Sequence, residues 1–275
     1  MLERAKMPTT KVGDINMYYE IHGNGDPLVI IPGLGSSTAY FFRQIPALAE
    51  EYRVIAFDNR GNGLSDKPDI PCSTEMMADD AAGLLDALRI RKAHIYGHSM
   101  GGMIAQHLAL RYPEMTASLI LACTSCGGRH VVPVDQEFIA NSFDTQQTPE
   151  ERIRGRLRFV FSQKFIDNNP DIIEHYISLY VKYTSPPHTY VRQAEAIVNH
   201  DTYDQLHEIK VPTLVITGTH GRLQPVETSR TLASRIPNAE LMIMDGMRHL
   251  LYIEGAEDVN NAIMRFLKRH PLEIR

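Results

Sequence analysis

Residues 93–102 read AHIYGHSMGG, and this stretch decides the fold. We predict a strand over Ala93–Tyr96 and a helix over Met100–Arg111. Between them stands Gly97-His98-Ser99-Met100-Gly101, a G-x-S-x-G motif in the strand-turn-helix context that this motif requires. In such a turn the backbone is crowded, which calls for glycines, and the serine hydroxyl projects into a cleft. We therefore predict that Ser99 is a nucleophile.

Strands and helices alternate from this stretch toward both ends of the chain. Leu28–Ile31 is a short apolar run that stops at a glycine turn, as a strand buried on both faces does. Strands separated by helices pair in parallel through right-handed crossovers. We therefore predict an α/β fold with a mostly parallel central sheet flanked by helices, and a hairpin over Lys11–His22. The other predicted strands are Arg53–Phe57, Ala117–Cys123, Thr213–Thr217 and Glu240–Met244, and the other predicted helices are Ala39–Glu50, Ser73–Leu88, Val226–Arg235 and Ala256–Lys268.

The strand pattern disappears between Gly127 and Ile209. Helical patterns cover Pro149–Ser162 and Asp171–Tyr183, Pro186-Pro187 interrupts them, and a further helical stretch includes Ala194–Asn199. A segment this long is not a plain loop in a compact domain. We predict that residues 1–126 and 210–275 form the core and that residues 127–209 form a helical cap over the carboxyl ends of the strands, where open α/β sheets bind ligands.

Composition narrows the classes of function. The chain has 275 residues and a net charge of −5 without any basic stripe, so we expect no nucleic-acid partner. It has no apolar run of membrane-spanning length and no secretory signal at its start, so we expect a cytoplasmic protein that does not act at a membrane. The three cysteines, Cys72, Cys123 and Cys126, are too few for a disulfide framework. No metal-ligand spacing or nucleotide-binding loop is present, so no metal or cofactor is expected.

Two further motifs carry a resemblance to a known family. Residues 58–65, DNRGNGLS, are similar to a D-x-R-G-x-G-x-S turn, and residues 32–36, PGLGS, resemble an H-G-x-x-x oxyanion loop with Pro32 in the histidine's place. With the serine turn, these motifs identify the chain as a member of the α/β-hydrolase superfamily, and it resembles the capped branch of enol-lactonases, small esterases and C–C bond hydrolases. The resemblance implies that the backbone N–H groups of Leu34 and Met100 form the oxyanion hole.

The same resemblance points to a general base and to a missing acid. The family histidine follows the last strand, and His249 stands there in the sequence Asp245-Gly246-Met247-Arg248-His249. The family acid follows the preceding strand in a G-x-x-D turn before a proline. In this chain the acid position, in the turn that begins at Gly218, is occupied by Gly221. The alternative acid position, after the earlier strand, offers Cys123, Thr124 and Ser125, none of which is a carboxylate.

Three interpretations of the missing acid remain open. Asp245 could act as a substitute acid for His249. Ser99 and His249 could work as a pair, since the oxyanion hole contributes separately to catalysis. The site could also be a ligand-binding pocket with an impaired triad, or Gly221 an acid-site variant. Arg248 adds a cation that faces either solvent or a substrate carboxylate.

We expect a serine hydrolase that acts on a small carboxylic ester or lactone. C–C bond hydrolysis is the alternative chemistry, because one fold hosts many reactions. A non-catalytic binding protein is the alternative class. The expected partner is a small-molecule substrate, and whether the chain forms a homo-oligomer stays open.

Overall fold

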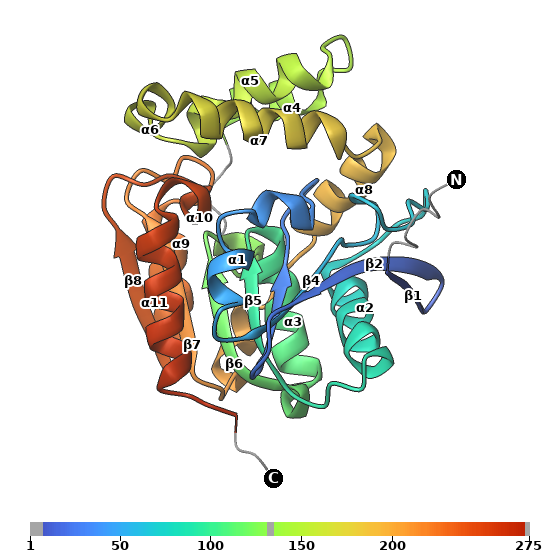
Figure 1. Cartoon of the computed structure of the whole chain (residues 1–275), viewed down its shortest axis with the longest axis vertical. Helices are drawn as coiled ribbons and strands as arrows, with labels where there is room; N and C mark the ends of the chain where they lie inside the picture. Colours follow the sequence, from blue (N-terminus) through green and yellow to red (C-terminus); the bar gives the residue numbers. More distant parts are fainter. Residues whose placement is uncertain (1–7, 131–134, 273–275) are drawn as a thin grey trace.

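The computed structural model describes residues 8–130 and 135–272. Within them, strands form one sheet in the order β1-β2-β4-β3-β5-β6-β7-β8 (Figure 1). β1 pairs antiparallel with β2 and β2 with β4, whereas every other pair is parallel. The predicted α/β class and the hairpin are confirmed. The strands are β1 (Thr9–Val12), β2 (Ile15–His22), β3 (Pro27–Ile31), β4 (Arg53–Phe57), β5 (Ala93–His98), β6 (Thr116–Ala122), β7 (Thr213–Gly218) and β8 (Ala239–Met244).

Helices cover both faces of the sheet, which explains why its central strands are buried at nearly every position. α2 (Thr74–Ala87), α3 (Met100–Arg111) and α9 (Val226–Arg235) share one core with Val29 and Ile31 of β3. α1 (Ile45–Leu48), α10 (Leu251–Glu254) and α11 (Ala256–Lys268) share the opposite core with Leu28 and Ile30. Because successive side chains of a strand point to opposite faces, a strand between two helical layers buries all of them.

The segment between β6 and β7 is helical where the structure describes it. It contains α4 (Gln136–Phe143), α5 (Pro149–Val160), α6 (Gln163–Asn168), α7 (Pro170–Lys182) and α8 (Pro187–Val198). Figure 1 shows α4 to α7 as a layer above the sheet, with α8 running back toward the core. Across residues 8–130 and 135–272, no helix is long and apolar enough to cross a membrane.

The single helix predicted over Ala39–Glu50 is wrong. A 3-10 turn, η1 (Thr38–Phe41), is followed by the short helix α1. Pro46 lies in this helix, lacks an N–H and opposes the carbonyl four residues earlier, so a continuous α-helix through it is disfavoured.

The turn after β4 holds the loop after β3 in place. The buried Asp58 carboxylate accepts hydrogen bonds from the backbone N–H groups of Thr38 (2.7 Å) and Leu64 (2.8 Å). The amide of Asn59 donates to the carbonyl of Pro32 at 2.9 Å. The two loops that the sequence singled out therefore form one hydrogen-bonded unit beside the serine turn.

Arg60 anchors this unit to helix α2. Its guanidinium is buried and pairs with the buried carboxylate of Asp80, and it also contacts the exposed Asp14 at 2.9 Å. Breaking a buried ion pair from one side leaves an uncompensated charge, which costs far more than losing an exposed pair.

We predict that Asp80→Ala lowers the free energy of unfolding by about 3–5 kcal/mol. The neighbouring Asp79 pairs with Arg111 at the surface, 2.8 Å away, and serves as the control. Asp79→Ala is expected to cost about 1 kcal/mol or less. Urea unfolding of both variants measures the difference, and equal losses would contradict the assignment.

Candidate active site

Ser99 stands on a strained turn between β5 and α3. Its φ of 57° and ψ of −123° lie in a region that residues other than glycine rarely adopt. Three hydrogen bonds hold the conformation. The Ser99 N–H donates to Ala122 O (2.9 Å), and the Ser99 carbonyl accepts from Gly102 N (2.8 Å) and from Thr124 Oγ1 (2.7 Å). The end of β6 thus fixes the serine from its neighbouring strand.

The glycines of the motif are required by close backbone contacts. A Cβ at Gly97 would lie 2.2 Å from the carbonyl oxygen of Gly101. A Cβ at Gly101 would lie 2.0 Å from the carbonyl oxygen of Ile31, at the end of β3. Real Cβ atoms do not approach so closely, so α3 can begin beside β3 only with glycine at these positions.

The structure brings four predicted site residues together. Ser99, His249, Leu34 and Met100 all line one cavity of about 150 Å³. This volume resembles a cavity that holds a benzene-sized ligand. Helices α5 and α7 contribute several of the other lining residues, so part of the segment between β6 and β7 belongs to the cavity wall.

Two backbone N–H groups at this cavity are free to bind an oxyanion. Met100 is the first residue of α3, where backbone donors have no partner within the helix. Leu34 lies in the loop after β3. Neither amide donates to a backbone acceptor within the described residues. Both can therefore donate a hydrogen bond to the negative charge that develops on a bound carbonyl oxygen.

His249 is buried and lacks the support that a general base usually has. Its Nδ1 has no hydrogen-bond partner in the described structure. Burial, with a smaller contribution from the nearby His98, holds the pKa of His249 well below its usual value. The two imidazole ring centres are 4.9 Å apart, and His98 Nε2 bonds to the His249 carbonyl at 2.9 Å. His98 thus fixes the backbone of His249, and its own pKa is lowered to about 4 by burial. Ser99 and His249 face the same cavity in their neutral forms.

Among the described residues, no carboxylate bonds to Nδ1 of His249. Asp245 is exposed and accepts a hydrogen bond from the hydroxyl of Thr219 at 3.2 Å. At Gly221, a Cβ would lie 2.3 Å from the carbonyl oxygen of Gln224. The turn around Gly221 is therefore too tight for an aspartate unless its backbone shifts.

One cluster near the base has the residue types of a metal site. Donor atoms of His98, Cys123 and His249 lie within 4.8 Å of one another. However, the Nε2 of His98 is already bonded to a carbonyl, and burial raises the pKa of the Cys123 thiol to about 12. A metal needs a thiolate and free imidazole nitrogens. The donor set therefore fits a neutral packed cluster better than a metal site.

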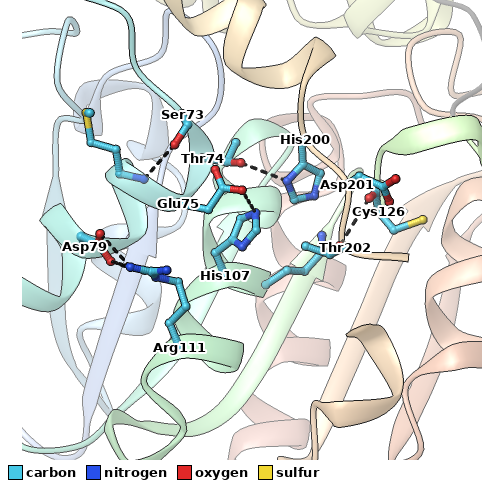
Figure 2. Close-up of polar contacts among 12 residues, drawn as sticks. Ser73, Thr74, Glu75, Asp79, His107, Arg111, Cys126, His200, Asp201 and Thr202 are labelled. Atoms are coloured by element: carbon cyan, nitrogen blue, oxygen red, sulfur yellow. Dashed lines mark hydrogen bonds and ion pairs between the residues drawn. The ribbon is translucent and has the colours of Figure 1, made fainter. Parts of the chain in front are cut away.

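A second polar cluster lies away from the cavity and serves the fold. Figure 2 shows His107 beside Glu75 and His200 beside Thr74, between α2, α3 and the chain that leaves α8. The nitrogen of His107 is 3.3 Å from the Glu75 carboxylate, and His200 Nδ1 is 3.0 Å from Thr74 Oγ1. Burial lowers the pKa of His200 to about 3, so it is a neutral hydrogen-bonding residue. This cluster fastens the end of the helical segment to the core.

The structure shows a residue at the cavity that the sequence analysis did not single out. Arg248, the cation that the sequence suggested, is not among the residues that line the cavity. Arg156 of α5 lines it instead and is buried. In the sequence it stands in the charged run Glu150–Arg158, where the helical spacing alone gives it no distinction from Arg152, Arg154 and Arg158.

Comparison with known proteins agrees with the motifs. Residues 26–256 match the family described as the alpha/beta hydrolase fold. A putative carbamate hydrolase of Azorhizobium caulinodans is 30% identical over 266 residues, which cover 94% of this chain and 98% of that protein.

Solved structures of similar proteins share the whole architecture. An enol-lactonase from Burkholderia xenovorans LB400 superimposes with a TM-score of 0.85 at 26% identity, covering 95% of this chain and 100% of its own. A meta-cleavage product hydrolase from Pseudomonas fluorescens IP01 superimposes with a TM-score of 0.82 at 25% identity, covering 95% and 97%.

Proposed function

Because this chain belongs to the α/β-hydrolase family, we propose that it is a serine hydrolase acting on a small carboxylic ester or lactone. The observation that carries the proposal is the meeting of Ser99, His249 and two unpartnered backbone amides at one cavity. A strained serine between β5 and α3 has no structural purpose that an unstrained residue would not serve better. The enol-lactonase neighbour supports the substrate class.

The proposed reaction has two halves. Ser99 Oγ attacks the carbonyl carbon while His249 takes its proton, and the carbonyl oxygen becomes an oxyanion that the Leu34 and Met100 amides bind. The intermediate collapses as His249 gives the proton to the departing alkoxide, leaving an acyl group on Ser99. Water then attacks the acyl carbon and loses its proton to His249, which returns it to Ser99 Oγ as the carboxylic acid leaves.

The missing acid limits the rate of this reaction. An acid at Nδ1 orients the imidazole and stabilises the imidazolium that forms when it takes a proton. Here Nδ1 has no partner and the imidazole is buried, so the imidazolium is costly. Loss of the acid with retained geometry costs a factor of about 10⁴ in a serine protease, although binding and the oxyanion hole remain. We therefore propose a slow Ser99–His249 pair rather than a complete triad.

We also propose that residues 127–209 act as a cap. Phe138, Ile153 and Tyr176 of this segment line the cavity opposite Ser99, so the segment excludes water from the reacting carbonyl. Low water content strengthens the hydrogen bonds of the oxyanion hole. C–C bond hydrolysis is the second candidate, supported by the meta-cleavage product hydrolase neighbour, and it would use the same serine, histidine and amides.

We predict that a fluorophosphonate forms one covalent adduct with the wild-type protein and none with Ser99→Ala. His249→Asn should slow labelling strongly because no other base removes the proton. Ser125→Ala, at a buried serine two residues beyond Cys123, serves as a control and should label normally. Intact-mass spectrometry reads the result. An unlabelled but folded wild-type protein would contradict the proposal.

We predict that an acid is restored more easily from Cys123 than from Gly221. Cys123 has a φ of 48°, which aspartate tolerates better than most residues, and its sulfur lies within 4.8 Å of a His249 ring nitrogen. Cys123→Asp should raise ester turnover about tenfold or more. Cys123→Asn should not, because asparagine has the shape of aspartate without its negative charge.

The comparison variant is Gly221→Asp, whose side chain collides with the Gln224 carbonyl and should give no such gain. Steady-state turnover of one ester measures all three variants. If Gly221→Asp alone raised the rate, the turn after β7 would be open to the acid and our account of it would be wrong.

A further inference from the structure

Arg156 is a buried cation at the wall of the cavity. It lies in α5, is 6% exposed, and shares the cavity lining with Ser99 and His249. An arginine side chain stays protonated even when buried. A charge in such a place is costly unless an opposite charge compensates it.

No carboxylate of the described chain pairs with Arg156. Its Nη2 donates to the hydroxyl of Tyr180 (2.6 Å) and its Nη1 to the hydroxyl of Tyr190 (3.4 Å), while Nε has no partner. The guanidinium also lies 5.2 Å from the ring centre of Tyr180 and 5.6 Å from that of Tyr190. Aromatic faces and phenols relieve part of the cost of burial, but they supply no negative charge.

The neighbouring arginines of the same helix show the contrast. Arg154 pairs with Glu150 and Glu174, and Arg158 pairs with Glu137, all at the surface. Arg60, the other buried arginine among the described residues, is paired with the carboxylate of Asp80. Arg154 and Arg158 therefore have counter-charges, whereas Arg156, which lines the cavity, has none among the described residues.

Polar atoms without partners gather at the same cavity. Tyr40 and Ser36 are among its lining residues, and the buried hydroxyls of both have no hydrogen-bond partner in the described structure. The ring of Tyr40 stacks on that of Tyr180, with ring centres 6.3 Å apart, so Tyr40 packs beside the phenol that Arg156 bonds. Because the Tyr180 oxygen accepts from Arg156, its own proton is free to be donated to a ligand.

The lining supplies donors but no acidic group. Among the described residues that line this cavity there is no aspartate or glutamate, and burial keeps His249 neutral. The cavity therefore has one permanent positive charge in its wall and room for a small ligand. A monoanion matches one cation, whereas a phosphate dianion would bring a second, unmatched charge.

We propose that Arg156 and Tyr180 bind a carboxylate of the substrate, so that the ester or lactone cleaved at Ser99 carries a free acid group. This inference rests on the proposed hydrolysis for the reaction, but the binding of the carboxylate can be tested without it. The guanidinium fork and the phenol recognise the two carboxylate oxygens, and this contact holds the ester carbonyl against Ser99.

A second cavity adjoins the first one at Arg156. It lies between α4, α5 and α8 and has a volume of about 360 Å³. It shares Gly35, Arg156, Tyr180 and Tyr190 with the cavity that Ser99 lines. Arg156 therefore stands at the boundary between the two cavities.

Two esters of nearly equal shape separate charge from size. Monomethyl succinate carries a carboxylate where methyl levulinate carries a methyl ketone. Binding is measured by calorimetry on Ser99→Ala, which cannot hydrolyse either ester. Monomethyl succinate should bind at least about tenfold more tightly, and the added change Arg156→Met should remove this preference. Equal binding of the two esters to Ser99→Ala would overturn the inference.

Kinetics then test the same contact in the active protein. The kcat/KM of the wild type should favour monomethyl succinate about tenfold or more, and Arg156→Met should bring the ratio near one. Arg156→Lys keeps the charge and should retain part of the preference, which also decides the matter if the methionine variant does not fold. Arg158→Met, at an exposed arginine of the same helix, should leave the ratio unchanged.

The two experiments fail in different ways. If neither ester is hydrolysed while Ser99→Ala still prefers the acid through Arg156, the proposed hydrolysis of such esters is wrong and the carboxylate site stands. If both esters are hydrolysed with equal kcat/KM, hydrolysis stands and the carboxylate site is wrong.

Discussion

The structure depends on the close crossing of the chain between β5 and α3. This crossing places the first turn of α3 against the end of β3 and leaves no space for a Cβ at Gly97 or Gly101. Ser99 is thereby held at a φ of 57°, in a strained conformation that the hydrogen bond to Ala122 and the packed sheet sustain. Met100, the first residue of α3, lines the same cavity, so one constraint positions both the proposed nucleophile and one of the two proposed oxyanion donors.

Burial has opposite effects on the two basic groups of the cavity. The imidazole of His249 responds by remaining neutral, because its pKa falls well below the usual value. The guanidinium of Arg156 cannot lose its proton and stays charged, with phenols in place of a carboxylate around it. Because His249 is neutral and Arg156 is charged, the described residues that line the cavity carry a positive charge that no negative charge balances unless an anion binds. In the proposed reaction the substrate supplies that anion. The imidazolium that forms on His249 during catalysis is the species that an acid would have stabilised.

The sequence predicted most of the core but little of the cavity wall. The bounds of α3, α9 and α11 follow from local signals, since apolar spacing and strand-to-helix turns are determined by neighbouring residues. The helix predicted at Ala39–Glu50 failed because Pro46 acts through backbone geometry that apolar spacing ignores. The role of Arg156 in the cavity wall could not be predicted from the sequence. Its burial depends on how α5 packs, and the same cavity is lined by Tyr40 and Ser36, which are more than a hundred positions away. For the same reason the absence of a carboxylate at His249 could be suspected from Gly221, but the tightness of that turn could not.

The most direct test of this account is the titration of His249 by nuclear magnetic resonance of protein labelled with ¹⁵N in its histidines. The His249 signals are assigned by their loss in His249→Asn. Since its pKa is lowered, the neutral form that can accept a proton persists as the pH falls below the usual value of about 6.5. The account predicts that the His249 imidazole is still mostly neutral at the pH where an ordinary histidine is half-protonated, about 6.5. An imidazole half-protonated near pH 7 or above would show that a carboxylate supports His249 and would contradict the claim that Ser99 and His249 act without an acid.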